Sequence, residues 1–353
     1  MPSRIPFHRS KTRRKMGDTR VRMSEVAQLA GVSLATVSRA INSPETVSSK
    51  LRAKVEEVSN RLGYLPNPIA GSLSGARSPL IGVIVPTMTN AFFSVTLEAL
   101  YEVLEPAGYQ LMVGFHEYDM AREEAIVAAY SAWRPAALVV TGVNHTRKTI
   151  SMLSSLDCPV IEMWDIDGRP IDTLIGFSNY DAGKAAAAHL IEIGRNNLVC
   201  VKLEKIDDPR ANARARGFCE EAAKNPTTTV KQFYAADRSV GDGSKVMKSI
   251  LEEFPDVNGI FCIGDAPAMG VLFEAQRQGI KVPNDIAIVG FGDLEASAHV
   301  APALTTVRPP HDQIGKTVAM HLLDRFNKTN SSGEVVDLGF QLIMRGSTRG
   351  STK

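Results

Sequence analysis

The stretch SEVAQLAGVSLATVSRAIN, residues 24–42, carries two short helical patterns with one glycine between them. In the first pattern Val26, Leu29 and Ala30 recur on one face, which is typical of an amphipathic helix. Gly31 then stands where a helix ends in the left-handed backbone conformation that glycine adopts without strain. We therefore expect one short helix to end before Gly31 and a tight turn to follow it.

A second helix is expected directly after this turn. Ser33 can cap it with its hydroxyl group, and its apolar residues Val37, Ala40 and Ile41 share an inner face. Neither helix is long enough to be stable alone, so a third helix has to complete the core. The sequence predicts an all-helical module over residues 23–66. Its third helix comes from SSKLRAKVEEVSNRLG, residues 48–63, with an apolar stripe of Leu51, Val55, Val58 and Leu62.

The outward face of the second helix carries small polar and methyl-bearing side chains and one arginine. A helix in the major groove of DNA uses such groups for base edges and phosphates. Any three-helix module could carry a polar face, but the pattern AGVSxxTVSRxxN is long and specific. It resembles the helix-turn-helix of the LacI/GalR family of bacterial transcriptional regulators. The candidate DNA contacts in this module are Ser33, Leu34, Ala35, Thr36, Ser38, Arg39, Asn42, Ser48 and Tyr64.

The resemblance continues through YLPNPIAGSLSG, residues 64–75. Asn67 can cap a helix of about two turns, which is too short to fold alone. In the family the matching segment is a hinge helix that folds on operator DNA and wedges a leucine into the minor groove. The resemblance implies that Asn67, Ala70 and Leu73 contact DNA. A plain flexible linker is the alternative for residues 67–79.

Residues 1–22 carry eight lysines and arginines against one acid, Asp18, although the net charge of the whole chain is only +2. A basic arm of this kind often follows phosphates. A disordered leader explains the segment equally well, with Met16 or Met23 as the natural start.

The composition indicates a soluble globular protein with two or three compact units. The chain has 353 residues, of which 44% are hydrophobic and 22% are charged. Neither a membrane span nor a secretory signal peptide is expected, so the interpretation is a cytoplasmic protein. No cofactor, metal or membrane partner is expected. The four cysteines lie far apart and suggest neither a metal clip nor a disulfide framework; they are Cys158, Cys200, Cys219 and Cys262.

From residue 80 onward, apolar strand patterns alternate with amphipathic helices, which is typical of parallel, doubly wound α/β sheets. Eight patterns fall into two sets of four, separated by IGFSNYDAG, and a helix is expected near residues 311–326. This two-lobed α/β arrangement over residues 80–348 resembles the periplasmic-binding-protein fold that the family uses as its effector domain. The eight strand patterns are LIGVIVP, YQLMVGFH, ALVVTG, PVIEMW, LVCVKLE, KQFYAA, GIFCIG and IAIVGFG.

Ligands of parallel α/β sheets bind beyond the carboxyl ends of the strands, so residues at those ends are candidates for a ligand site. Hydroxyl, carboxylate and guanidinium groups with an aromatic plate are typical of a sugar site. Each residue alone could equally be a solvated loop residue. The candidates are Thr89, Asn90, Phe92, Phe93, His116, Thr141, Glu162, Trp164, Asp165, Asn179, Arg210, Arg214, Asp265 and Asp293.

Arg214 has the strongest support, because RARGF, residues 214–218, matches the family motif R-x-x-G-aromatic whose first arginine faces the effector. A guanidinium group can hold a carboxylate through two hydrogen bonds, and Arg210 lies one helical turn earlier. Gly264 and Gly292 depart from the pattern, because many relatives carry an asparagine and an acid there. These departures put a lactose-like or purine-like site in doubt.

Three longer segments resemble the gluconate-operon repressors within this family, and they are residues 175–182, 258–291 and 337–347. The resemblance implies a repressor that a sugar acid such as gluconate releases from DNA. Ketogluconate or 6-phosphogluconate would fit as well, and a neutral sugar or a corepressor remains possible. One module makes few contacts, so we expect a homodimer on a palindromic operator.

An enzyme and a secreted sugar-binding protein are the rival classes. Gly315, Lys316 and Thr317 resemble the end of a phosphate-binding loop, but Pro310 occupies the place of the earlier glycine. The seven histidines form no HExxH zinc motif. The absence of a signal peptide and the presence of the helical module argue against a secreted binding protein. The sequence therefore indicates a DNA-binding regulator, not an enzyme.

Overall fold

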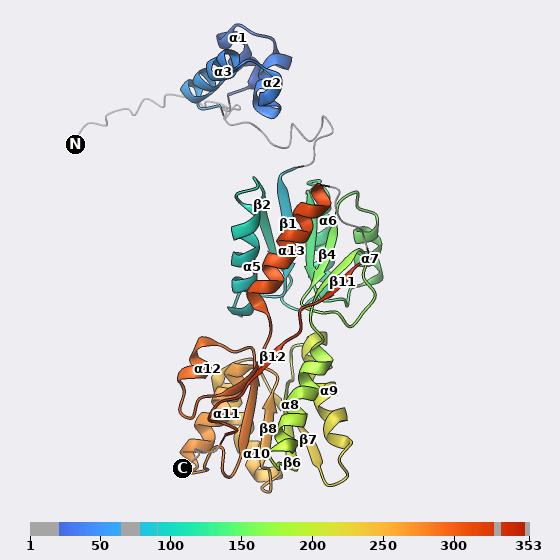
Figure 1. The fold of residues 1–353 in the computed structure, drawn as a ribbon, viewed down its shortest axis with the longest axis vertical. Helices are drawn as coiled ribbons and strands as arrows, with labels where there is room; N and C mark the ends of the chain where they lie inside the picture. The colour runs from blue at the N-terminus through green and yellow to red at the C-terminus, as the bar shows by residue number, and fades with distance from the viewer. Residues whose placement is uncertain (1–20, 65–77, 90, 328–332, 350–353) are drawn as a thin grey trace, which may run out of the picture. The chain divides into compact units, whose positions relative to one another are not determined.

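The computed structural model describes residues 21–64, 78–89, 91–327 and 333–349. The chain divides into two compact units, residues 1–78 and residues 79–353. Figure 1 shows the small helical unit and the larger α/β unit, and each is described here by itself.

The helical unit has three helices around one small core. They are α1 (Met23–Ala30), α2 (Leu34–Asn42) and α3 (Ser49–Leu62), with a short 3-10 turn at η1 (Pro44–Thr46). The core residues are Val26, Ala27, Ala30, Val37, Ala40, Val55, Val58 and Tyr64.

The predicted turn chemistry of the helical unit is confirmed. Gly31 ends α1 with a φ of 64°, and the backbone N–H of Thr36 donates to the Ser33 hydroxyl at 3.1 Å. The predicted inner face of α1 is wrong at one position, because Leu29 is 52% exposed. Val26, Ala27 and Ala30 form the buried stripe, and at 100° per residue Leu29 points well away from its centre.

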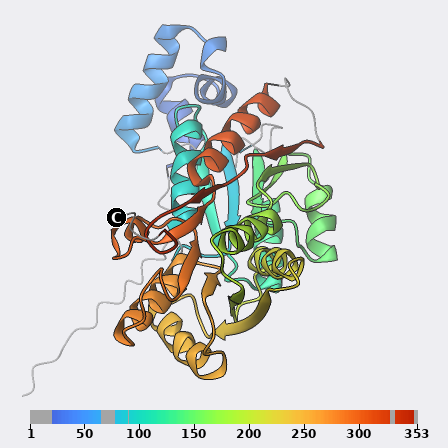
Figure 2. The ribbon, with the colours of Figure 1, turned by 60° about the horizontal axis from the view of Figure 1, so that its bottom comes forward.

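The α/β unit consists of two lobes, each built on a six-stranded sheet with helices on both faces, as Figures 1 and 2 show. The sheet of lobe 1 is parallel throughout, in the order β11-β5-β4-β3-β1-β2. Its elements are β1 (Leu80–Val85), α5 (Ala91–Leu104), β2 (Gln110–Phe115), α6 (Met120–Ser131), β3 (Ala137–Thr141), α7 (Arg147–Ser154), β4 (Val160–Met163), β5 (Thr173–Gly176), α13 (His311–Phe326) and β11 (Val335–Asp337).

Lobe 2 has the strand order β12-β10-β9-β8-β6-β7, and only the β10–β12 pair is antiparallel. Its elements are α8 (Asn179–Glu192), β6 (Asn197–Leu203), α9 (Pro209–Ala223), β7 (Thr229–Ala235), α10 (Val240–Glu253), β8 (Gly259–Cys262), α11 (Asp265–Arg277), β9 (Ala287–Phe291), α12 (Glu295–His299), β10 (Thr305–Arg308) and β12 (Gln341–Ile343).

All eight predicted strands form, and α13 has the predicted bounds. The separation into two sets of four was incomplete, because β5 extends the first sheet and β10 extends the second. The C-terminal stretch then adds β11 to lobe 1 and β12 to lobe 2. The chain therefore crosses between the lobes three times, after β5, after β10 and after β11.

The packing of α8 against α9 decides where the side chains of α9 lie. Gly183 on α8 approaches the backbone of Arg214 so closely that an added Cβ atom would lie 1.9 Å from its carbonyl oxygen. Gly217 makes the reciprocal approach to the carbonyl oxygen of Tyr180. Only glycine permits this distance, so these two positions fix α9 next to the start of α8.

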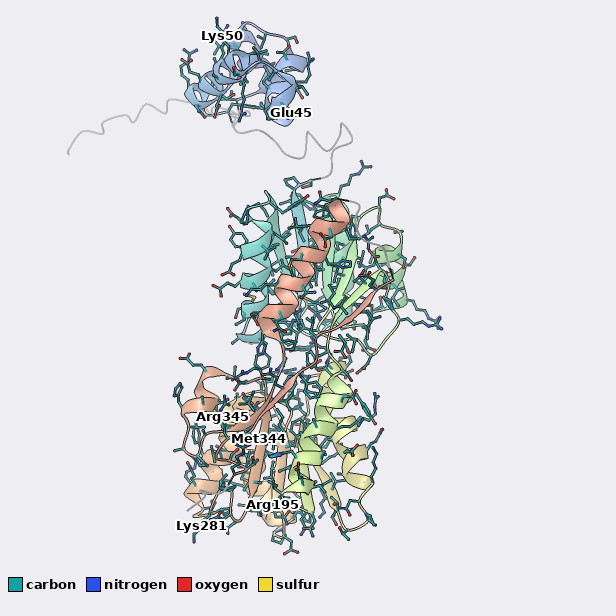
Figure 3. All side chains as sticks on the ribbon, viewed as in Figure 1. Glu45, Lys50, Arg195, Lys281, Met344 and Arg345 are labelled. Atoms are coloured by element: carbon teal, nitrogen blue, oxygen red, sulfur yellow. The ribbon has the colours of Figure 1, made fainter. Side chains whose placement is uncertain are left out.

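Among the described residues, no helix has both the length and the apolar composition that crossing a bilayer requires. Figure 3 shows the side chains of the described residues as sticks on the ribbon. Arg195, labelled there, donates from its guanidinium group to the carbonyl oxygens of Pro283 and Asn284.

Candidate DNA interface and effector cleft

The candidate DNA contacts lie on the helical unit with different exposures. Ser33, Leu34, Ala35, Arg39 and Ser48 are exposed or partly exposed, and Thr36 and Ser38 are half-buried. Leu34 at the start of α2 is 52% exposed. This face therefore offers an arginine, hydroxyl groups and methyl groups from one helix.

Tyr64 differs from the other candidates, because its ring is buried among the apolar side chains of the helical core. Its predicted DNA contact stays a prediction, and packing explains its presence. The side chain of Asn42 and the candidates Asn67, Ala70, Leu73 and Asn90 lie outside the described residues.

The cleft of the α/β unit lies where the carboxyl ends of the strands of the two lobes meet. The Phe92 ring at the start of α5 lies 6.3 Å from the Trp164 ring of lobe 1 and 6.2 Å from the Phe291 ring of lobe 2. The His311 ring, where the chain returns to lobe 1, lies 5.1 Å from Phe92. Aromatic side chains from both lobes thus form the apolar wall of the cleft.

Three arginines of lobe 2 project into this cleft and lie over aromatic rings. Arg210 is 5.4 Å from the ring centre of Phe93, and Arg214 is 3.8 Å from that of Phe291. The third, Arg238, follows β7 and lies 4.8 Å from the ring of Tyr118 in lobe 1. Arginines on aromatic faces are stabilised by cation–π attraction.

One buried carboxylate, that of Asp208, pairs with two of these arginines. Asp208 accepts a hydrogen bond from Arg210 Nε at 3.2 Å and from Arg238 Nη2 at 2.9 Å. Burial alone would raise the pKa of Asp208, but the charges of Arg210 and Arg238 hold it well below its usual range. Three guanidinium groups therefore face one ionised carboxylate, which leaves the cleft with excess positive charge.

Among these arginines, Arg214 is the one whose charged form is most destabilised by its surroundings. Burial, together with the charges of Arg238 and Arg210, lowers the pKa of Arg214 to about 9, although Asp208 opposes the shift. Its Nη1 donates to the side-chain oxygen of Asn179 at the start of α8. The Asn179 amide in turn donates to the carbonyl oxygen of Trp164 at 3.0 Å. Arg214, Asn179 and Trp164 are therefore held as one unit across the lobes.

Several buried polar atoms of the cleft have no hydrogen-bond partner among the described residues. Trp164 Nε1, Arg214 Nε and Arg238 Nε are such atoms. Each of the three is an N–H group that can only donate. Buried donors without partners cost free energy, and a bound molecule with acceptor oxygens would remove that cost.

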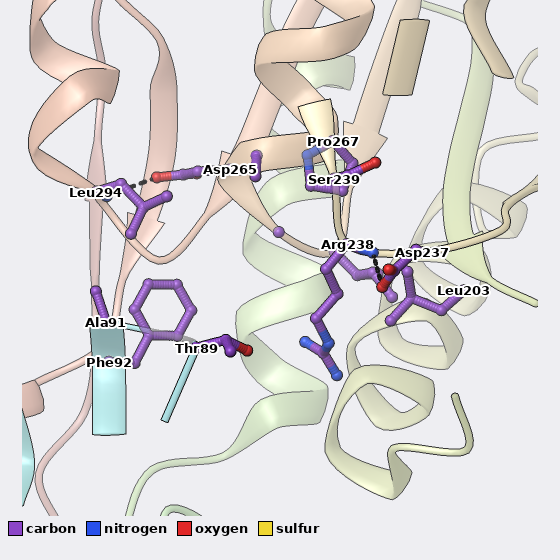
Figure 4. A pocket seen from close by; sticks show the side chains of 13 residues that line it. Thr89, Ala91, Phe92, Leu203, Asp237, Arg238, Ser239, Asp265, Pro267 and Leu294 are labelled. Carbon is purple, nitrogen blue, oxygen red and sulfur yellow. Dashed lines mark hydrogen bonds between the residues drawn. The ribbon is translucent and has the colours of Figure 1, made fainter. Parts of the chain in front are cut away.

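Three cavities open around these residues. The central cavity of ≈ 20 Å³ is lined by Phe92, Phe93, Trp164, Asn179, Arg210 and Arg214, among others. A second cavity of ≈ 20 Å³ is lined by His116, Thr141 and Arg210, among others. The third, of ≈ 520 Å³, has Thr89, Phe92, Arg238 and Asp265 in its lining, as Figure 4 shows. The structure thus brings together most of the candidates from the sequence.

Glu162, Asp165 and Asp293 line none of these three cavities and have protein partners instead. Glu162 accepts from the backbone N–H of Ile171 at 2.6 Å, and Asp165 accepts from two backbone N–H groups that follow it. Asp293 forms ion pairs with Arg308 and Arg345. Their predicted role in effector binding stays a prediction.

Asp265 reaches the large cavity, but its carboxylate is already satisfied. It accepts hydrogen bonds from Thr306, Ser297 and the backbone N–H of Leu294. The Asp265–Leu294 bond is drawn in Figure 4. These bonds tie α11 to the loop after β9 and explain the aspartate without a ligand.

Sequence reasoning missed Tyr118, Asp208, Arg238 and Phe291, which all line the central cavity. Two of them carried a signal, because Asp208 precedes a proline at the first position of α9 and Tyr118 follows β2 closely. Arg238 lies in the loop after β7, where only the rule on carboxyl strand ends could have found it.

The departure at Gly292 has a structural reason. Gly292 has a φ of 126°, and an added Cβ atom would lie 1.8 Å from the ring of Phe92. The Phe92 ring occupies the space into which any side chain at this position would project. The Phe92 ring thus fills the place of the acidic side chain that the resemblance implied there.

Together, a helix-turn-helix unit and a two-lobed α/β unit with a polar cleft define a ligand-responsive DNA-binding protein. Residues 22–67 match "Bacterial regulatory proteins, lacI family", and residues 187–348 match "Periplasmic binding protein-like domain". The chain is 35% identical over 330 residues to the HTH-type transcriptional regulator GntR of Pseudomonas aeruginosa, covering 92% of this chain and 95% of that one. The chain belongs to the LacI family.

Two solved structures show the same fold. A LacI-family transcriptional regulator from Silicibacter pomeroyi has a TM-score of 0.86 at 28% identity, covering 93% of this chain and 99% of that one. The lac repressor dimer bound to operator and an anti-inducer has a TM-score of 0.78 at 24% identity, covering 94% of this chain and 99% of that one. The predicted fold and family are confirmed. The chain is a DNA-binding transcriptional regulator with a small-molecule effector, and members of its family are not enzymes.

Proposed function

We propose that this regulator is a repressor that binds a palindromic operator as a homodimer and is released by a sugar acid such as gluconate. The proposed effector site is the cleft between the lobes, made up of the central cavity and the ≈ 520 Å³ cavity that shares Phe92 and Arg238 with it. Arg214, Arg238 and Trp164 are its proposed recognition groups. The proposed DNA contacts are the exposed residues of α2, headed by Arg39. Operator DNA places this activity on the nucleoid, in the cytoplasm.

One observation carries the choice of an acidic effector. Trp164 Nε1, Arg214 Nε and Arg238 Nε are buried donors that line one cavity, and none has a partner among the described residues. A ligand that satisfies three donors has to bring acceptors, and a carboxylate brings the most acceptor capacity in the least volume. The excess of guanidinium groups over carboxylates in the same cavity supports the same choice.

The aromatic walls of the cleft support a sugar skeleton on the acid. The Trp164 and Phe92 rings line the central cavity and give it an apolar wall against which the C–H groups of a polyol chain can pack. An acid without such a chain would leave these surfaces poorly packed. A neutral sugar would leave the guanidinium charges uncompensated, so we rank it below a sugar acid.

The proposed switch couples ligand and DNA through the geometry of the lobes. The chain crosses between the lobes three times, so a ligand that fixes their relative position acts on all three connections. Lobe closure would alter the dimer surface of lobe 1 and with it the hinge segment ahead of residue 79. Linkage requires that ligand and operator change each other's affinity by the same factor. Release of DNA by the ligand is the proposed sign; corepression needs no different residue types.

Lobe 1 carries the surface that we propose for the homodimer. Val95 and Tyr101 on α5 are 41% and 43% exposed, and Phe115 at the end of the edge strand β2 is 44% exposed. Large apolar side chains exposed on neighbouring elements are typical of a subunit interface. The lac repressor, which shares this fold, was solved as a dimer on its operator.

A thermal-shift titration of the full chain with gluconate, ketogluconates, 6-phosphogluconate and the matching neutral sugars tests the effector class. A sugar acid present at a hundred times its dissociation constant should stabilise the folded protein by about 2.7 kcal/mol. Neutral sugars at the same concentrations should leave the transition unchanged. Stabilisation by neutral sugars alone, or by none of the sugar acids, would overturn the proposed effector class.

A further inference from the structure

A second small cavity adjoins the proposed effector site under the ring of His116. His116 follows β2 directly and is only 2% exposed. Both of its ring nitrogens are buried and have no hydrogen-bond partner among the described residues. The cavity of ≈ 20 Å³ is lined by His116, Tyr118, Thr141 and Arg210, among others. The Tyr118 hydroxyl is also buried and has no hydrogen-bond partner in the described part of the chain.

The surroundings of His116 favour a neutral ring. Burial lowers the pKa of His116, and Arg210 and His145 lower it further, while Glu123 and Asp208 oppose them. These groups, with the Tyr118 ring at 6.2 Å, face the imidazole from α6, from α9 and from the loops after β2 and β3. Glu123 lies 4.0 Å from Nε2 and already accepts from His145 at 2.7 Å. A neutral imidazole offers one N–H donor and one lone pair.

We propose that this cavity binds a single hydroxyl group of the effector and that His116 recognises this group through hydrogen bonds. A hydroxyl group both donates and accepts, so it matches a neutral imidazole better than a carboxylate, which only accepts. The volume is enough for one water-sized oxygen group. The Glu123 carboxylate, 4.0 Å from His116 Nε2, disfavours a second anionic group next to this ring.

The position of the cavity predicts how the bound effector is oriented. The His116 cavity and the central cavity share Tyr118, Asp208 and Arg210 in their linings, so they are neighbours along one path. The carboxylate then lies at Trp164, Arg214 and Arg238, and the hydroxyl-bearing end of the chain lies at His116. This assignment rests on the proposed function, because it takes a sugar acid as the ligand of the central cavity.

Calorimetric titration of the full-chain protein with gluconate and with 6-deoxygluconate tests the assignment. The two probes differ only in the terminal hydroxyl group. Because a buried hydrogen bond that the ligand cannot make costs free energy, gluconate should bind to the wild type about tenfold tighter than 6-deoxygluconate. His116→Phe keeps a planar aromatic ring and removes the hydrogen bonds, so it should bind both probes equally. His299→Phe, at the exposed end of α12, is the matched control and should keep the preference.

The possible outcomes separate the two proposals. Equal binding of gluconate and 6-deoxygluconate to the wild type overturns the role of His116. A preference that persists in His116→Phe also overturns it. If neither probe binds the wild type while a neutral sugar does, the proposed function itself fails. Should His116→Phe not fold, His116→Leu removes the same hydrogen bonds with a smaller side chain and should likewise bind both probes equally.

Discussion

At the scale of single residues, the chain buries charged groups in the cleft and compensates their charges incompletely. Arg214 is 5% exposed, its pKa is lowered to about 9 by burial, and its Nε has no partner among the described residues. Buried groups with perturbed pKa values and unpaired donor atoms are typical of ligand-binding sites. Structural ion pairs look different, as Arg308 and Arg345 show by pairing with Asp293.

Replacing Arg214 should separate ligand binding from DNA binding. We expect Arg214→Ala to weaken binding of the sugar acid at least about tenfold, since hydrogen bonds to charged groups contribute about 1.5–3 kcal/mol. Operator binding without ligand should stay near the wild-type value. Calorimetry and fluorescence anisotropy measure the two properties. Arg216→Ala on the same helix, with a side chain 63% exposed, is the control; a normal ligand response in Arg214→Ala would move the site elsewhere.

A buried histidine gives lobe 1 a distinct dependence on pH. His145 Nδ1 shares a hydrogen bond with Glu123 at 2.7 Å, and its other ring nitrogen lies 3.6 Å from Glu162. Burial alone would lower the pKa of His145, but the hydrogen bonds and charges of both glutamates raise it to about 9. The folded pKa is above the unfolded one of 6.5, so this stabilisation is complete below pH 6.5 and is lost as pH rises through 9.

The expected loss of unfolding free energy between pH 6.5 and 9 is on the order of 3 kcal/mol. Both tryptophans, Trp133 and Trp164, belong to lobe 1, so tryptophan fluorescence during urea unfolding reports on this lobe. His145→Gln should be less stable at pH 6.5 and should lose the slope. A wild-type free energy that stays constant across this range would show that the ring is not charged in the folded protein.

At the scale of elements, the eight central strands, the three helices of the helical unit and α13 could be predicted because their patterns are local. The continuous apolar runs of β1 and β3 and the spacing of α13 carry enough information alone. The four residues of β5 do not, since this segment is as short as a turn and only its neighbours β4 and β11 make it a strand.

The cleft was harder to predict than the strands that frame it. The rule on carboxyl strand ends found Trp164 and Arg214, because both follow or adjoin recognisable patterns. It missed Arg238, because sequence alone does not say which buried charges pair with each other. Gly183 illustrates the same limit, since its close approach to Arg214 is visible only once α8 and α9 are packed.

Helix α2 should carry the sequence preference for DNA. Arg39→Ala removes the exposed guanidinium from this helix and should weaken operator binding by about 1–3 kcal/mol, with a smaller loss on random DNA. Anisotropy titrations with both duplexes at one salt concentration measure the difference. Arg52→Ala on α3 is the control for loss of a positive charge. Equal losses on operator and random DNA would leave Arg39 with a phosphate contact only.

Helix α5 should hold the homodimer together. Tyr101→Glu places a charge on the exposed apolar face of α5 and should shift the protein from dimer to monomer in sedimentation velocity experiments. The matched variant Trp133→Glu changes another exposed aromatic residue of lobe 1, after α6, and should leave the dimer intact. An unchanged dimer in Tyr101→Glu would place the interface on another face.

At the scale of the whole molecule, the chain combines two units with different functions. The helical unit binds a specific DNA sequence, and the cleft of the α/β unit binds the small-molecule effector. Binding energies of DNA and ligand then affect each other only through states of the protein that differ in affinity for both. A coupling of typical size, about 1–3 kcal/mol, changes operator affinity roughly 5- to 150-fold.

The most direct test of this account is the operator affinity of the full-length protein with and without saturating gluconate. The operator is first selected from a pool of random duplexes, and its affinity is then measured by fluorescence anisotropy. The account predicts that gluconate weakens operator binding at least about fivefold and that operator weakens gluconate binding by the same factor. An operator affinity that no sugar acid changes would contradict it.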